Sequence, residues 1–269
     1  MQPSDQDLVL QRFHRDLISG SHILHYHNVL DAFGHLSVRH PLNPQIFILS
    51  RNTAPGTISS PNDLIEYYIE DARPVDPSAP TGFIERCIHS ECYKRYPEVQ
   101  SVIHSHSEAV VPYSISGVPL RACFHMAGFL GTNVPIWDIA DAQQPEDISD
   151  LLVRNQHLGS SLAASFSGIA SGSISPEHVV ALMRGHGFTV LAGSIQDCVM
   201  RAIYTQKNAA IQSTALSTRS TGTTVTGPVK YLSQKEVDAT TWSIAKSAHR
   251  PWTLWLREIE ASGLYANSA

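Results

Sequence analysis

Apolar residues near the N-terminus recur at the spacing of an amphipathic helix. The stripe stops at Gly20 and then resumes, so residues 5–30 are predicted to form a pair of helices. Two shorter apolar runs follow, at residues 35–40 and 45–51, with prolines and an asparagine between them. This pattern predicts two adjacent strands joined by a turn.

Three further elements are predicted before the middle of the chain. Residues 60–68 (SPNDLIEYY) begin with a serine that can cap a helix and a proline at a first-turn position, which favours a short helix. Residues 82–96 carry apolar side chains on one helical stripe that ends before Pro97. Residues 99–107 (VQSVIHSHS) then indicate a strand.

The second half begins with residues 141–167, which have a helical pattern. Residues 178–194 indicate two strands joined at the Gly-His-Gly of 185–187. Ser194 and Asp197 are spaced as a capping box, which predicts a long helix that ends at about Leu216.

Residues 213–227 are rich in serine, threonine and glycine and are predicted to form a mobile loop or linker. A second capping box at 233–236 introduces a C-terminal helical region. That region holds Trp242, Trp252 and Trp255.

Strands and helices therefore alternate, and no Rossmann, Walker or kinase motif accompanies them. We predict an α/β fold with one mixed central sheet flanked by helices. The whole chain, 1–269, is predicted to be a single domain.

Composition restricts the kinds of partner. The net charge is −5 and no run of lysine or arginine exceeds two residues, so we expect no nucleic-acid partner. The apolar runs are short and the N-terminus is polar, so we expect no membrane span or secretory signal and a cytoplasmic location. Four cysteines without a Cys-x-x-Cys pair are expected to be free thiols. A small molecule is the expected partner.

Histidine is the compositional exception, because the fourteen copies are about twice the number that average usage would give. In a strand, His104 and His106 point to the same face about 6.6 Å apart along the chain, so both rings can converge on one divalent ion. Imidazole is a common ligand of zinc and iron. The alternative is that the two are core histidines with satisfied hydrogen bonds, or exposed residues on a strand edge.

Two other residues could complete such a site. His186 lies between two glycines, whose missing side chains allow a tight turn and the approach of a ligand, although it could simply be a turn residue. Glu85 lies on the predicted helix just before the His-x-His strand. Its carboxylate could instead be a solvated helix charge paired with Arg86 or Lys94.

Three segments together resemble the class II aldolase/adducin family, which includes fuculose-phosphate aldolase and ribulose-phosphate epimerase. They are VLDAFGHLSVRHP, ERCIHSECYKRYPEVQSVIHSHSEAVVPYS and MRGHGFTVLAGSIQDCVMRAIYTQKNA. The resemblance covers about residues 10–215 and leaves a C-terminal helical extension at about 228–265. It implies that His104, His106 and His186 bind a metal and that Glu85 is the acid/base carboxylate. It also implies a homotetramer with active sites at subunit interfaces.

The sequence departs from the sugar-phosphate aldolases of that family where they hold phosphate. Their two serines before the glutamate are replaced here by Phe83 and Ile84. Their Gly-Asn pair corresponds to Gly34 and His35, which we expect to contact substrate. The resemblance therefore implies an unphosphorylated substrate and a more apolar pocket.

Two more substitutions bear on the substrate and on proton transfer. The Thr-Gly turn of the aldolases corresponds to Ser50 and Arg51, and Arg51 could hold a carboxylate through two parallel hydrogen bonds. An ion pair of Arg51 with Asp63 or with Glu66 is the alternative. Counting nineteen residues from the second metal histidine, where the aldolases have an acid/base tyrosine, leads to His125, which can also carry a proton.

We therefore expect a metal-dependent carbon–carbon lyase that acts on a hydroxylated aromatic or keto acid, by decarboxylation or retro-aldol cleavage, through a metal-stabilised enolate. Zinc is the expected ion, with manganese, iron and cobalt as alternatives. A non-haem iron oxygenase on the same ligands is a second hypothesis. A non-catalytic, adducin-like binding protein is a third.

Overall fold

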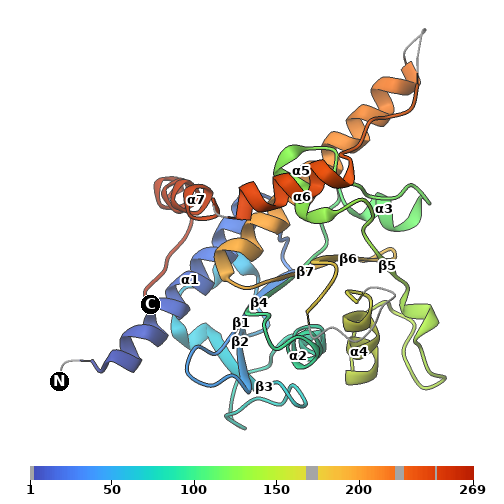
Figure 1. Cartoon of the computed structure of the whole chain (residues 1–269). Helices are drawn as coiled ribbons and strands as arrows, with labels where there is room; N and C mark the ends of the chain where they lie inside the picture. The colour runs from blue at the N-terminus through green and yellow to red at the C-terminus, as the bar shows by residue number, and fades with distance from the viewer. Residues whose placement is uncertain (1–2, 168–174, 222–226, 246) are drawn as a thin grey trace.

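The computed structural model describes residues 3–167, 175–221, 227–245 and 247–269. Their centre is a seven-stranded mixed sheet with the order β3-β2-β1-β4-β7-β6-β5 (Figure 1). Neighbouring strands are antiparallel except for β5 and β6, which are parallel. The strands are β1 (His35–Arg39), β2 (Ile46–Ser50), β3 (Leu64–Tyr68), β4 (Ser101–Ser105), β5 (Ile136–Trp137), β6 (Val180–Met183) and β7 (Gly187–Ala192).

Helices cover both faces of this sheet, so the predicted fold class is confirmed. In Figure 1, α2 and α4 lie on one side of the sheet, and α1, α5, α6 and α7 lie on the other. The helices are α1 (Asp5–Tyr26), α2 (Arg86–Arg95), α3 (Val111–Ile115), α4 (Gln156–Ala164), α5 (Ile195–Thr221), α6 (Gln234–Ala245) and α7 (His249–Ser262). The 3₁₀ segments are the single turns η1 (Pro55–Thr57), η2 (Pro61–Asp63) and η4 (Ile139–Asp141), and the six-residue η3 (His125–Leu130), which is kinked at Ala127.

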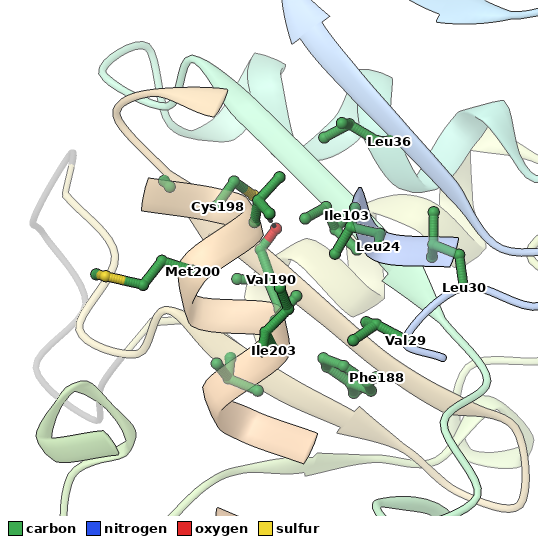
Figure 2. Close-up of a cluster of buried hydrophobic side chains, with 14 of the residues drawn as sticks. Leu24, Val29, Leu30, Leu36, Ile103, Phe188, Val190, Cys198, Met200 and Ile203 are labelled. Carbon is green, nitrogen blue, oxygen red and sulfur yellow. Dashed lines mark hydrogen bonds between the residues drawn. The ribbon is translucent and has the colours of Figure 1, made fainter. Parts of the chain in front are cut away.

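Alternate residues of the central strands belong to two separate cores. On β4, Ile103 packs in the core under α1 and α5, whereas Val102 packs in the core under α2 and α4. Figure 2 shows the first core, where Cys198 and Ile203 of α5 lie over β-strand residues that include Phe188. Because side chains alternate along a strand, His104 faces the α2 side with Val102.

Several sequence predictions are confirmed. The strands at 35–39 and 46–50 pair as an antiparallel hairpin, and β6 and β7 flank the Gly-His-Gly turn. At the start of α5, Ser194 Oγ accepts the Asp197 amide N–H at 3.1 Å. At the start of α6, Glu236 accepts the N–H and hydroxyl of Ser233. All four cysteines are free thiols.

The predicted break at Gly20 is wrong, because α1 is one continuous helix through that position. A Cβ at Gly20 would lie 2.8 Å from Leu36 Cδ2 and 3.2 Å from Ile195 Cγ2. The glycine therefore allows α1 to pack closely against β1 and α5 without ending the helix.

The short helix predicted at 60–68 is only the single turn η2, and β3 follows it. Ile65 and Tyr67 are buried while their neighbours are more exposed, which is the two-residue period of a strand. Residues 141–167 also contain less helix than predicted. α4 begins only after Asn155, whose side chain accepts the Leu158 N–H, and Leu151 has a φ of 66° that no helix accommodates.

The loop predicted at 213–227 is helical as far as Thr221, and residues 222–226 of that prediction lie outside the described residues. Thr214 and Thr218 donate their hydroxyls to carbonyl oxygens four residues earlier, so the polar side chains are satisfied within the helix. Within the described ranges, no helix has both the length and the apolar content needed to cross a bilayer. The single-domain prediction stays a prediction.

Candidate metal centre

Three parts of the fold bring Glu85, His104, His106 and His186 together. His104 is on β4, His106 follows the end of that strand, and His186 is in the turn between β6 and β7. β4 and β7 are paired neighbours, so the turn before β7 lies beside the end of β4. Glu85 is the residue before the first turn of α2, which lies over the same face.

Of the two roles predicted for the glycines around His186, the structure shows the tight turn, and at Gly187 it shows close packing on the neighbouring strand rather than room for a ligand. Gly185 adopts a φ of 66°, the left-handed conformation that glycine tolerates best. A Cβ on Gly187 would lie 2.0 Å from the carbonyl oxygen of Ser105. The absence of a side chain at Gly187 therefore allows the His186 turn to approach the His104 strand.

The three Nε2 atoms of the histidines converge on one point. His104 and His106 are 3.0 Å apart, His104 and His186 are 3.3 Å apart, and His106 and His186 are 3.2 Å apart, measured between Nε2 atoms. Two imidazoles that bind one cation at about 2.0–2.1 Å place their nitrogens about 2.8–3.4 Å apart, for angles between 90° and tetrahedral. The observed triangle fits a bound divalent ion.

The protonation states also fit an ion. Burial lowers the pKa of His104 well below its usual value and lowers the pKa of His186 to about 4, so both rings are neutral near pH 7. Their Nδ1 atoms are buried and make no hydrogen bond to the described residues. With the single ring proton on Nδ1, the Nε2 lone pairs point at one another, an arrangement that a cation stabilises.

Glu85 lies at the edge of this triangle. Its Oε2 is 3.7 Å from the Nε2 of both His104 and His186, and its Oε1 accepts the Val153 N–H at 2.9 Å. Burial raises the pKa of Glu85 to about 7, although the Val153 amide and Arg154 lower it. A carboxyl with that pKa can give or take a proton near neutrality.

Asp31 orients the third ring, and the sequence reasoning missed it. Both Asp31 carboxylate oxygens are 3.2 Å from His106 Nδ1, and Oδ1 also accepts the N–H groups of Phe33 and Gly34. A carboxylate on the far nitrogen directs the other ring nitrogen toward a metal. The sequence did hold a signal for this role. Asp31 stands two and three residues before the Phe33 and Gly34 amides that it caps, and Gly34 is itself a predicted site residue.

Gly34 and His35 lie beside the four residues. A Cβ at Gly34 would be 2.7 Å from Leu30 Cδ2 and 3.1 Å from the His104 carbonyl oxygen, so Gly34 allows a close approach. His35 is the direct cross-strand neighbour of His104, and their ring centroids are 5.2 Å apart. Phe83, which stands where the aldolases have a serine, packs on the His35 ring at 4.6 Å.

Arg51 makes the ion pair that was the alternative to a substrate clamp. Its Nε donates to Asp63 Oδ1 at 2.9 Å, and Asp63 also accepts the amides of Ser59 and Ser60. The Nη atoms of Arg51 bond to nothing in the described part of the chain, and 47% of the side chain is exposed. Ser50 is buried at the end of β2.

His125 is not brought to the cluster within its own chain. It is the exposed first residue of η3, and its ring contacts Phe124. The neighbouring Gly128 packs against Thr240 of α6 rather than against the histidines. In the described ranges, no contact joins His125 to Glu85.

Comparison with known proteins identifies the family. Residues 15–213 match the family described as Class II Aldolase and Adducin N-terminal domain. The chain belongs to this family. Among solved structures, the L-fuculose 1-phosphate aldolase of Glaciozyma antarctica has a TM-score of 0.72 at 17% identity, covering 99% of this chain and 96% of that one. The class II aldolase fold is therefore shared across a low sequence identity.

Curated relatives show which branch of the class II aldolase and adducin family is similar. A protein named decarboxylase tropJ, from Talaromyces stipitatus, is 52% identical over 258 residues, which is 95% of this chain and 97% of the relative. The 3,4-dihydroxyphthalate decarboxylase of a Terrabacter species is 31% identical over 116 residues, 43% of each chain. The chain is thus an enzyme of the lyase class, and the hypothesis of a non-catalytic binding protein is not supported.

Proposed function

We propose that this enzyme is a metal-dependent decarboxylase of an unphosphorylated, hydroxylated aromatic carboxylic acid. The observation that carries the proposal is the cluster of Glu85, His104, His106 and His186, of which the first two are buried and the others half-buried, in a chain 52% identical to a decarboxylase. The dihydroxyphthalate decarboxylases support the substrate class, since their named substrate has carboxylates and hydroxyls on one ring. Retro-aldol cleavage of a keto acid is a less supported use of the same residues.

In this proposal the three histidines hold the ion through Nε2, and zinc is the ion that three imidazoles favour, with manganese, iron and cobalt as alternatives. A bound divalent cation would supply a Lewis acid that stabilises negative charge on the oxygens of the substrate. Asp31 would keep His106 in the tautomer that leaves Nε2 free.

Glu85 is the proposed proton donor. When the bond between the ring and the carboxylate breaks, carbon dioxide leaves and the electron pair of that bond stays on the ring carbon. That carbon takes the proton of the Glu85 carboxyl, and water then returns a proton to Glu85. The Val153 amide fixes the other carboxyl oxygen, so the proton-bearing Oε2 faces the histidines.

The residues around Glu85 favour an aromatic, unphosphorylated acid. Phe83 offers a ring in place of a hydroxyl, and it already packs against the His35 ring at a tilt of 52°. Arg51 can contribute its Nη groups to a substrate carboxylate while Nε stays on Asp63. We assign His125 to the site of a neighbouring subunit in a homotetramer, because in its own chain it is exposed and apart from the cluster.

The test is carbon dioxide release from a panel of hydroxylated aromatic acids, with purified protein loaded with zinc, manganese, iron or cobalt. His104→Ala is expected to lose both metal content and activity, whereas His249→Ala, an exposed histidine at the start of α7, keeps both. Retention of activity by metal-free His104→Ala would refute the proposal. Activity that disappears without dioxygen would instead support the oxygenase hypothesis.

A further inference from the structure

The helix α2 presents a polar stripe to the sheet. Glu85, His89 and Tyr93 are spaced four residues apart, so they lie on one side of the helix, and all three are buried. Glu85 belongs to the candidate metal centre. His89 and Tyr93 take no part in the proposed mechanism, although buried polar side chains are costly unless they are hydrogen-bonded.

Their partners are on β1. His89 Nε2 is 2.7 Å from His35 Nδ1, and His89 Nδ1 is 2.6 Å from Ser37 Oγ. Ser37 Oγ is in turn 2.7 Å from the Tyr93 hydroxyl oxygen. The four side chains form one buried hydrogen-bonded chain that begins at Tyr93 and ends at His35, beside His104.

The direction of this chain follows from its Tyr93 end. A neutral imidazole has one donor and one acceptor, and burial lowers the pKa of His89 to about 3, so its ring is neutral. If Tyr93 donates to Ser37, then Ser37 donates to His89 and His89 donates to His35, so each hydrogen between Tyr93 and His35 Nδ1 has an acceptor.

The opposite direction is disfavoured. Ser37 would then donate to the Tyr93 oxygen, and the tyrosine hydrogen would need another acceptor. Within the described residues Tyr93 Oη has no hydrogen-bond partner other than Ser37, and the side chain is 1% exposed. A buried hydroxyl hydrogen without an acceptor is unfavourable, so the first direction is the stable one.

This direction of the hydrogen bonds determines the tautomer of His35. Because its Nδ1 accepts from His89, its hydrogen is on Nε2, on the other side of the ring. Nε2 has no hydrogen bond to a described residue, and it is not among the fully buried polar atoms without a partner, so some of its surface is open to a small ligand. The His35 ring itself lies beside the His104 ring and the Phe83 ring, with centroid distances of 5.2 Å and 4.6 Å.

We propose that Tyr93, Ser37 and His89 are positioning residues that fix His35 as the Nε2–H tautomer, and that His35 donates this hydrogen to an oxygen of the bound acid. The second half of this inference rests on the proposed function. An Nε2 lone pair in the same place would repel a carboxylate or phenolate oxygen, so the direction of the chain selects for an anionic substrate.

The tautomer can be measured without turnover. In ¹⁵N-histidine-labelled, zinc-loaded protein, the nitrogen shifts of His35, assigned by comparison with His35→Gln, are expected to show a protonated Nε2 and an unprotonated Nδ1. A protonated Nδ1 would overturn the inference. This readout stays valid if the enzyme turns out to have no decarboxylase activity, so the two failures are distinguishable.

The contribution to binding is tested with a matched pair of variants and 2,3-dihydroxybenzoate as the probe. His89→Leu removes the donor to His35 and is expected to weaken probe binding to the zinc-loaded enzyme by about tenfold or more. His89→Gln keeps an amide N–H near the same place and should restore most of the affinity. Equal affinity of the wild type and both folded variants would overturn the substrate contact, and the NMR measurement still decides the tautomer if His89→Leu does not fold.

Discussion

Replacing Asp31 by asparagine is expected to weaken zinc binding by about tenfold while leaving the fold intact. Asp31 Oδ1 accepts the Phe33 and Gly34 amides, and an asparagine oxygen can keep both bonds. The asparagine oxygen also keeps the 3.2 Å contact of Oδ1 with His106 Nδ1, and the lost interaction is that of the second carboxylate oxygen with the same nitrogen. An asparagine NH₂ there faces an N–H donor, which favours the His106 tautomer whose Nε2 carries the hydrogen and cannot bind metal.

The magnitude follows from the contact. Removal of such an outer carboxylate typically costs about 10–100-fold in metal affinity. The oxygens are 3.2 Å from Nδ1, at the long end of the hydrogen-bond range, and the Asp31 side chain is 50% exposed. Both features favour the lower end, about tenfold, which corresponds to about 1.4 kcal/mol.

The assay is a competition titration of zinc between the protein and a colorimetric chelator at fixed pH and ionic strength. Asp76→Asn is the matched control, because Asp76 caps the Ser78 amide in a similar turn but has no hydrogen bond or ion pair to a histidine among the described residues. We expect the control to bind zinc like the wild type. An Asp31→Asn protein whose zinc affinity stays within twofold of the wild type would refute the role given to Asp31.

Three further predictions concern the same centre. Gly187→Ala places a Cβ 2.0 Å from the Ser105 carbonyl oxygen and should destabilise the protein by about 1–3 kcal/mol in thermal unfolding. The control is Gly193→Ala, which should not destabilise the protein because a Cβ there meets nothing within 4 Å. Equal melting temperatures of the two variants would contradict the close approach at Gly187. Glu85→Gln should keep its zinc but lose about 10²–10⁴ in kcat, and wild-type turnover would remove Glu85 as proton donor. Chelation of the metal should abolish activity and lower the melting temperature, both restored by zinc; a chelated enzyme that stays active would exclude the metal centre.

Local patterns predicted the parts of the site that depend on neighbouring residues. The two-residue period of a strand was enough to place His104 and His106 together, and the glycines around His186 indicated a tight turn. The positions that were missed depend on pairings between distant segments. Asp31 is 75 residues from His106 in the chain, and no spacing rule connects an aspartate cap to a histidine that far away.

The secondary-structure predictions failed where tertiary packing outweighs the local preference of the residues. Gly20 usually weakens a helix, but here its missing side chain lets three elements approach, and the packing compensates for the lower helix propensity. Similarly, the threonines after residue 213 suggested a loop, yet their hydroxyls bond back to the helix that contains them. Composition alone does not distinguish these cases from real breaks.

The polar stripe of α2 indicates how the fold and the chemistry depend on each other. An apolar stripe would pack on the sheet at lower cost, since burying Glu85, His89 and Tyr93 requires a hydrogen-bond partner for each. The partners of His89 and Tyr93 are on β1, and they are in place only when the His35–His104 pairing of β1 and β4 is in register. A one-residue slip of β1 would turn both His35 and Ser37 to the opposite face and leave His89 and Tyr93 buried without partners. The same chain of bonds that directs a hydrogen toward the candidate centre therefore also specifies the strand register that assembles it.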